Sequence, residues 1–172
     1  FGSLVTAVSR LNTGGKYDNK VFQKSIGLNG VGTKAVNALS SHFRIQSVRD
    51  GQTKVAIFAE GKLVEDMEVQ PSTEENGTSI FFEPDETLFV NYKFQNQFVE
   101  TLLRNYTYLN TGLTFIYNGQ KILSRHGLED LLKDNMTSEG LYDVVHLKGE
   151  DIEIAFTHTN QYGEEYYSFV NG

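Results

Sequence analysis

Cysteine and tryptophan are absent from the 172 residues, and proline occurs only twice. Without cysteine the chain has neither a disulfide framework nor a thiolate metal site, which is typical of proteins in a reducing cytoplasm. No apolar run approaches the roughly 20 residues of a membrane-spanning helix, and the sequence from Phe1 onward has no signal-peptide pattern. We therefore expect a cytoplasmic globular protein with no membrane partner.

Basic residues are scarce as well. The chain has 15 Lys and Arg against 22 Asp and Glu, a net charge of −7. Nucleic-acid backbones are bound by clustered Lys and Arg, so this balance argues against broad contact with DNA or RNA and leaves only a local basic patch. Hydrophobic residues make up 39% of the sequence, enough for one packed domain and part of a second. Sequence typical of a domain interior starts directly at Phe1, so we expect a piece of a longer protein.

The most informative local pattern is Gly27-Leu28-Asn29-Gly30-Val31-Gly32, which leads without a break into a predicted helix. Three glycines in six positions let the backbone adopt positive φ and approach a ligand closely. The loop and the free N–H groups of the helix can then point at one anion, which is typical of phosphate binding. The missing Gly-Lys-Ser/Thr ending argues against a P-loop, and the polar residues 22–26 argue against a Rossmann unit. Plain packing of a Gly-rich turn stays open as an alternative.

Apolar residues at helical spacing predict four helices. The first covers residues 2–11. The second covers residues 33–40, with Lys34 in its first turn and a buried stripe made of Ala35, Val36, Ala38 and Leu39. The third and longest starts at Phe94, and its stripe is Phe94, Phe98, Leu102, Tyr106 and Leu109. The fourth is short and turns Leu128, Leu131 and Leu132 inward.

Alternating residues predict strands between these helices. Residues 43–48 form the first strand, with Phe43 and Ile45 on one face, and Asp50-Gly51 then marks a tight hairpin. Further strands lie around Val55, Ile57 and Leu63, with a turn at Gly61-Lys62, and over residues 78–82. Two later hairpins are predicted, residues 113–122 about Asn118-Gly119, and residues 152–157 with 166–170. Sheets with helices on one side predict an α+β layered sandwich.

Few side chains outside the glycine-rich segment follow a pattern typical of a site. The four histidines, His42, His126, His146 and His158, lack the spacing of metal ligands. Lys16 follows Gly14-Gly15, so its ammonium group either reaches a bound phosphate or is an ordinary surface cation. Arg49 shares strand parity with Phe43 and Ile45, so we expect it to face inward and to need a partner, which a carboxylate of this chain would also supply. Thr78 is most simply a β-former.

These motifs together resemble one family. The run Leu11-Asn12-Thr13-Gly14-Gly15-Lys16-Tyr17-Asp18, residues 27–32, and Ala35-Val36-Asn37-Ala38-Leu39-Ser40 are similar to the ATPase region of bacterial type II DNA topoisomerase B subunits, those of topoisomerase IV more than those of gyrase. Three later stretches continue the resemblance in the same order: Gly77-Thr78-Ser79-Ile80-Phe81-Phe82-Glu83-Pro84, Tyr108-Leu109-Asn110-Thr111-Gly112 and Ser168-Phe169-Val170-Asn171. The resemblance covers nearly the whole chain, which makes it far more specific than one Gly-rich loop.

The resemblance implies a fold, a division of the chain and a set of partners. The fold is an α+β layered sandwich of the GHKL (Bergerat) ATPase type. Residues 1–140 correspond to the C-terminal part of that ATPase domain, and residues 141–172 begin a ribosomal-S5-like transducer domain. The implied cofactors are ATP and Mg²⁺. In the family they close a dimeric clamp that passes one DNA duplex through another, so the implied partners are DNA, the topoisomerase A subunit and a second B subunit.

The resemblance also assigns ATP-binding residues one by one. The phosphate-binding motif is matched by Gly27, Leu28, Asn29, Gly30, Val31 and Gly32, and the loop that closes over the phosphates is matched by Gly15 and Lys16. Thr78 matches a threonine near the adenine, and Arg49 matches an arginine at the rim of its pocket. Phe22 stands where gyrase subunits usually carry a tyrosine, so that hydroxyl is absent, and Asn29 replaces a histidine that is commoner in gyrase.

No catalytic or metal-binding residue is assigned within these 172 residues. In the family the general-base glutamate, the Mg²⁺-binding asparagine and the adenine-binding aspartate precede the matched stretch, and the lysine that reaches the γ-phosphate follows it. Hydrolysis needs a positioned base and a metal ion, so we expect these residues alone to be inactive. Two alternatives stay open: another GHKL ATPase such as a mismatch-repair protein, and a non-catalytic interaction module that uses the same sandwich without nucleotide.

Overall fold

The computed structural model describes residues 4–11 and 30–170. The chain forms two compact units, Phe1–Lys93 and Phe94–Gly172, and each is described by itself. The described helices and strands of the first unit are α1 (Leu4–Ser9), α2 (Gly32–Ala38), β1 (Ser40–Arg49), β2 (Gln52–Ala59), β3 (Lys62–Asp66), β4 (Gln70–Pro71) and β5 (Gly77–Pro84). Those of the second unit are α3 (Asn96–Leu109), β6 (Thr114–Tyr117), β7 (Gln120–Leu123), α4 (Leu128–Asn135), β8 (Val145–Lys148) and β9 (Glu153–Phe156).

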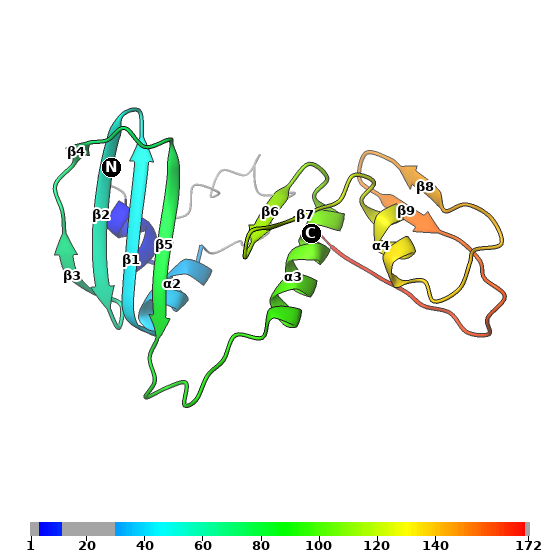
Figure 1. The fold of residues 1–172 in the computed structure, drawn as a ribbon, viewed down its shortest axis with the longest axis horizontal. Coiled ribbons are helices and arrows are strands. Elements are labelled where there is room, and N and C mark those ends of the chain that lie inside the picture. Colours follow the sequence, from blue (N-terminus) through cyan, green and yellow to red (C-terminus); the bar gives the residue numbers. More distant parts are fainter. Residues whose placement is uncertain (1–3, 12–29, 171–172) are drawn as a thin grey trace. The chain divides into compact units, whose positions relative to one another are not determined.

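The first unit is built on an antiparallel sheet with the strand order β3-β2-β1-β5, and β4 pairs with the end of β2 (Figure 1). The β1–β2 turn is the predicted one, because Asp50 and Gly51 both adopt positive φ, 52° and 76°. Such a pair of residues fits the twist of the flanking strands. The next turn is at Glu60 and Gly61, with φ of 50° and 75°, so it lies one residue earlier than predicted and Lys62 already belongs to β3.

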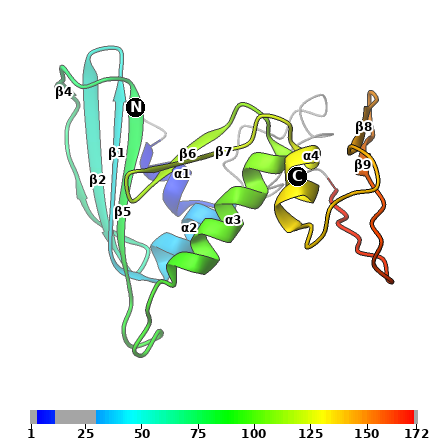
Figure 2. The ribbon, with the colours of Figure 1, turned by 45° about the vertical axis from the view of Figure 1, so that its right-hand side comes forward.

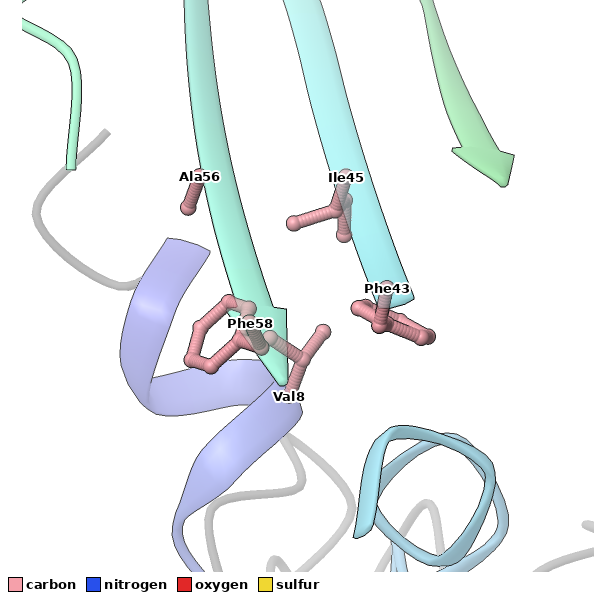
Figure 3. Close-up of a cluster of buried hydrophobic side chains, with 5 residues drawn as sticks. All are labelled: Val8, Phe43, Ile45, Ala56 and Phe58. Carbon is pink, nitrogen blue, oxygen red and sulfur yellow. The ribbon is translucent and has the colours of Figure 1, made fainter. Parts of the chain in front are cut away.

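The core of this unit lies where helices cover one face of the sheet (Figure 3). Phe43 pairs with Phe58 and Ile45 pairs with Ala56 across β1 and β2, so paired residues share a face. Val8 of α1 packs on these four residues, and Val36 of α2 joins them half-buried. The predicted placement of Phe43 and Ile45 on one face is confirmed, because both are buried.

The prediction for the second helix is wrong in two respects. The helix ends at Ala38 instead of residue 40, because Leu39 and Ser40 turn into the sheet: Glu60 donates its backbone N–H to the Ser40 carbonyl at 2.8 Å. The predicted apolar stripe also faces outward, since Ala35, Ala38 and Leu39 are exposed and only Val36 is half-buried. The residues that the helix buries are Lys34 and Asn37. Two alanines bury little apolar area, so the hydrogen bonds of these polar side chains outweigh the apolar pattern.

Gly61 is needed for both its conformation and its small size. Its φ is +75°, and a Cβ at this position would lie 3.2 Å from the Cα of Ala38. We expect Gly61→Ala to lower the free energy of unfolding by about 1–2 kcal/mol, since left-handed backbone is costly for residues with a Cβ. Urea denaturation measures the loss. Gly77→Ala is the control, because a Cβ there meets nothing closer than 3.9 Å, and an equal loss in both variants would contradict the assignment.

The second unit consists of two hairpins and two helices (Figure 2). The predicted hairpin about Asn118-Gly119 is confirmed by β6 and β7, which meet at positive φ of 49° and 80°. Helix α4 buries Leu131 as predicted. Tyr108 of α3 is also buried, and its hydroxyl donates a hydrogen bond to the carboxylate of Asp134 in α4. Burial and this hydrogen bond raise the pKa of Tyr108, so the phenol stays protonated at neutral pH.

Two predictions for the second unit are wrong. Strand β9 pairs with β8, a strand that was not predicted, and residues 166–170 form no strand. Helix α3 was expected to bury a stripe from Phe94 to Leu109, but Phe98 and Leu102 are 69% and 56% exposed. The helix buries Thr107 and Tyr108 at its C-terminal end instead, where it contacts α4 and β7. Among the described residues, no helix combines the length and apolar character that crossing a bilayer requires.

Candidate functional site

The structure describes five of the residues predicted to bind the nucleotide: Gly30, Val31, Gly32, Arg49 and Thr78. The other six, Gly15, Lys16, Phe22, Gly27, Leu28 and Asn29, lie outside the described residues. The described five fall into two groups. One group lies at the start of α2 and the other at one end of the sheet. The described residues show no hydrogen bond or ion pair that joins the two groups.

The first group leaves backbone donors available at the start of α2. Gly30 has a φ of 56°, in the left-handed region that favours glycine. The first helical hydrogen bond runs from the Ala35 N–H to the Val31 carbonyl at 2.9 Å, and Val31 makes no side-chain cap. The N–H groups of residues 32–34 therefore have no acceptor within the helix. A Cβ at Gly32 would meet no atom of the described residues within 4 Å.

Lys34 was not assigned to the site from the sequence, although it lies in the first turn, where a cation opposes the helix dipole. In the structure this residue is only 7% exposed, and its ammonium group donates a hydrogen bond to the carbonyl of Gly30. A buried cation is costly unless its charge is compensated. An anion bound beside the glycine-rich segment would supply that compensation.

The second group is organised by the register of the central strands. Three rows of paired residues cross β5, β1 and β2 on the face that the helices cover: Phe82, Phe43, Phe58; then Ile80, Ile45, Ala56; then Thr78, Ser47, Lys54. The first two rows are apolar and the third is polar. Thr78 therefore lies at the boundary between the core and a polar end of the same face. Sequence patterns did not indicate Ser47 or Lys54, because their proximity to Thr78 depends on the strand order.

Arg49 is the last residue of β1, two positions beyond Ser47. The expectation that it faces inward is wrong: its side chain is 78% exposed, and its Nε lies 3.5 Å from the Asp50 carboxylate. The strand ends there, so the guanidinium group reaches water without a desolvation cost. The predicted partner is thus a carboxylate of this chain, in an exposed pair that contributes little to stability. Arg49 stays available to a ligand at the polar end of the sheet.

Metal ligation is not indicated for the described part of the chain, because no three His, Asp or Glu side chains gather there. Each histidine has a local neighbour instead. His126 contacts Asp130, His146 contacts Glu153, His158 contacts the Tyr142 hydroxyl, and His42 stacks edge-on against Phe81. All four histidines thus have a neighbour within their own unit.

Curated relatives match the chain along most of its length, although no protein-family model matches it. The chain is 46% identical over 172 residues to the DNA topoisomerase 4 B subunit of Borreliella burgdorferi, a match that covers 99% of this chain and 28% of that protein. It is 34% identical over 180 residues to the DNA gyrase B subunit of Thermotoga maritima, with 94% of this chain and 28% of that protein covered. The chain therefore spans just over a quarter of the length of each.

Solved structures include a chain with a similar fold. It comes from the crystal structure of the 43K ATPase domain of Thermus thermophilus gyrase B in complex with an aminocoumarin, which matches with a TM-score of 0.62 and 25% identity. The match covers 73% of this chain and 38% of that one, and it confirms the predicted α+β fold of the ATPase type. Over its 172 residues, the chain belongs to the family of type II DNA topoisomerase B subunits.

Proposed function

We propose that this chain supplies part of the ATP-binding site of a type II DNA topoisomerase, with ATP and Mg²⁺ as cofactors. The observation that carries the proposal is the 46% identity over the whole chain to a topoisomerase 4 B subunit. The glycine-rich start of α2, whose first N–H groups have no acceptor within the helix, also supports it. The comparisons favour this reading over a mismatch-repair ATPase, because the curated relatives named above are topoisomerase and gyrase subunits.

The residues assigned to the nucleotide would act in two groups. Backbone N–H groups of residues 32–34 would hold phosphate oxygens, together with Gly27, Leu28, Asn29, Gly30 and Val31, while Gly15 and Lys16 would close over them. Thr78 would lie near the adenine at the polar end of the sheet and Arg49 at the rim of the adenine pocket, and the family resemblance adds Phe22 to these residues. When bound, ATP supplies the phosphoanhydride bond whose hydrolysis drives the conformational cycle. No catalytic base or Mg²⁺ ligand is proposed among the described residues.

The partners and the domain division are part of the same proposal. DNA, a topoisomerase A subunit and a second B subunit would act with the whole protein in the cytoplasm, and the cysteine-free composition suits a reducing compartment. Residues 1–140 would belong to the ATPase domain and residues 141–172 to the transducer domain. The division at residue 140 rests on the family resemblance alone, because the two compact units of the structure divide after Lys93 instead.

A thermal-shift measurement tests nucleotide binding. The 172-residue chain is compared with the full-length gene product that carries it, each with Mg²⁺ and a non-hydrolysable ATP analogue. A ligand at 100 times its Kd stabilises the native state by about 2.7 kcal/mol, so we expect a clear rise in Tm for the full-length protein and a smaller one or none for the 172 residues. Arg49→Ala should reduce the rise, whereas Arg125→Ala, an exposed arginine of the second unit, should not. No rise in either protein would favour the non-catalytic interaction module.

A further inference from the structure

A buried polar contact joins α1 and α2, the helices that the structure describes in the first unit. The side-chain amide of Asn37 in α2 donates a hydrogen bond to the carbonyl of Val8 in α1 at 2.9 Å. Asn37 is 1% exposed and Val8 is 3% exposed, so water does not compete for this bond. We propose that Asn37 is a positioning residue for nucleotide binding, because it fixes α2, and with it residues 30–32, to the end of α1. This inference rests on the proposed function.

The acceptor of this bond lies in the last turn of α1. Helix α1 ends at Ser9, one residue after Val8, and the carbonyls of the last turn of a helix need partners outside it. Asn37 caps the Val8 carbonyl from 29 positions away in the sequence. The bond therefore joins the end of one helix to the body of the next.

A buried polar contact adds to the apolar packing of Val36 in holding α2 in place. The helix has only seven residues, too few to be stable without tertiary contacts. Its inward line is Lys34 and Asn37, three positions apart and therefore neighbours on one face. Asn37 reaches to α1, and Lys34 reaches back to the Gly30 carbonyl. Hydrogen bonds are directional, so the Asn37 bond to α1 fixes the orientation of the helix more narrowly than apolar packing of Val36 alone would.

The other polar atom of Asn37 shows that stability alone does not explain an asparagine here. Its side-chain oxygen is buried, and no described residue donates a hydrogen bond to it. A buried unpaired acceptor is unfavourable, and an apolar residue of similar volume would avoid that cost. The amide therefore contributes less to stability than its burial suggests. Its specific contribution is to hold the start of α2, and with it the backbone N–H groups of residues 32–34, in position.

The test compares Asn37→Leu with Ser9→Ala in the full-length gene product. Leucine keeps the volume and removes the donor, while Ser9→Ala removes a hydrogen bond within α1, from the Ser9 hydroxyl to the Val5 carbonyl, and leaves the contact between the helices intact. We expect Asn37→Leu to raise the KM for ATP about tenfold, with a smaller change in kcat and a Tm within a few degrees of the unaltered protein. Ser9→Ala should leave the KM unchanged.

Two results would overturn the inference alone: an unchanged KM in Asn37→Leu, or a KM that changes only in proportion to a loss of folded protein. Asn37→Ala, measured in parallel, covers the case in which leucine does not fit. Its KM should rise as well, at a temperature where circular dichroism shows it to be folded. Failure of the unaltered protein to bind ATP would instead overturn the proposed function, and this inference with it.

Discussion

Replacing Phe58 with alanine is expected to lower the free energy of unfolding of the first unit by about 3–5 kcal/mol. The Phe58 side chain is fully buried and packs edge-to-face on Phe43, with ring centroids 6.1 Å apart. Truncation removes the buried ring, its contact with Val8 and the aromatic pair together. The small sheet and short helices leave few other apolar side chains to fill the cavity, so the loss should fall in the upper part of the range for core substitutions.

Urea denaturation followed by far-UV circular dichroism measures this loss, since the chain has no tryptophan. The matched control is Phe81→Ala. Phe81 lies in the same sheet, opposite Arg44 on the other face, and is 51% exposed. We expect the control to lose less than about 1 kcal/mol. Similar losses for both variants would mean that the helix-covered face is not the core.

Replacing Asp130 with alanine is expected to cost about 2 kcal/mol in the second unit and to remove part of its acid sensitivity. The carboxylate of Asp130 accepts hydrogen bonds from the Ser124 hydroxyl at 2.6 Å and from the backbone N–H groups of Arg125 and His126 at 3.1 and 2.9 Å. It also contacts the His126 ring at 3.1 Å. These contacts hold the turn that starts α4 and place a negative charge in the first turn of the helix.

The pKa of Asp130 gives the sign of the pH dependence. Burial raises this pKa, but the hydrogen bonds from Ser124, His126 and Arg125 together outweigh burial and lower it from 3.8 to about 2. The folded unit therefore binds this proton more weakly than the unfolded chain does. A shift of this size corresponds to about 2 kcal/mol, present above pH 4 and lost as the pH falls from about 4 to about 2.

Urea denaturation at pH 7 and at pH 2.5 measures both the loss of stability in Asp130→Ala and its pH dependence. The difference in stability between the two pH values should be smaller in Asp130→Ala than in the unaltered chain by about 2 kcal/mol. Glu139→Ala, an exposed carboxylate of the same unit, should leave the difference nearly unchanged. An Asp130→Ala chain with the full acid sensitivity of the parent would show that other groups are responsible.

Local turn and strand patterns carried most of what could be predicted about the fold. Asp50-Gly51 and Asn118-Gly119 need positive φ at two successive positions, a requirement that few residue pairs meet, so the sequence alone located both hairpins. The alternation of Phe43 and Ile45 located the buried face of β1 for a similar reason. These signals lie within a few residues, and distant parts of the chain do not alter them.

Predictions failed where a distant contact decides the outcome. Helix α2 buries Asn37 because of the Val8 carbonyl 29 residues earlier, and no periodicity within the helix reveals that partner. Strand β9 pairs with β8 and not with residues 166–170. Alternation within a strand shows which side chains share a face, but it does not show which segment is the partner strand. For the site, the glycine-rich pattern indicated residues 27–32, but the row formed by Thr78, Ser47 and Lys54 depends on strand order.

Because of the three rows across β5, β1 and β2, the position of Thr78 depends on the same strand register as the packing of the core. Side chains alternate between the faces of a sheet, so a slip of β5 by one residue against β1 would carry Thr78 to the opposite face and, in the same step, remove Ile80 and Phe82 from beside Ile45 and Phe43. The strand therefore has no intermediate register in which the polar row is displaced and the apolar rows are intact. The apolar rows of Ile80 and Phe82 thus keep Thr78, near the start of β5, on the helix-covered face.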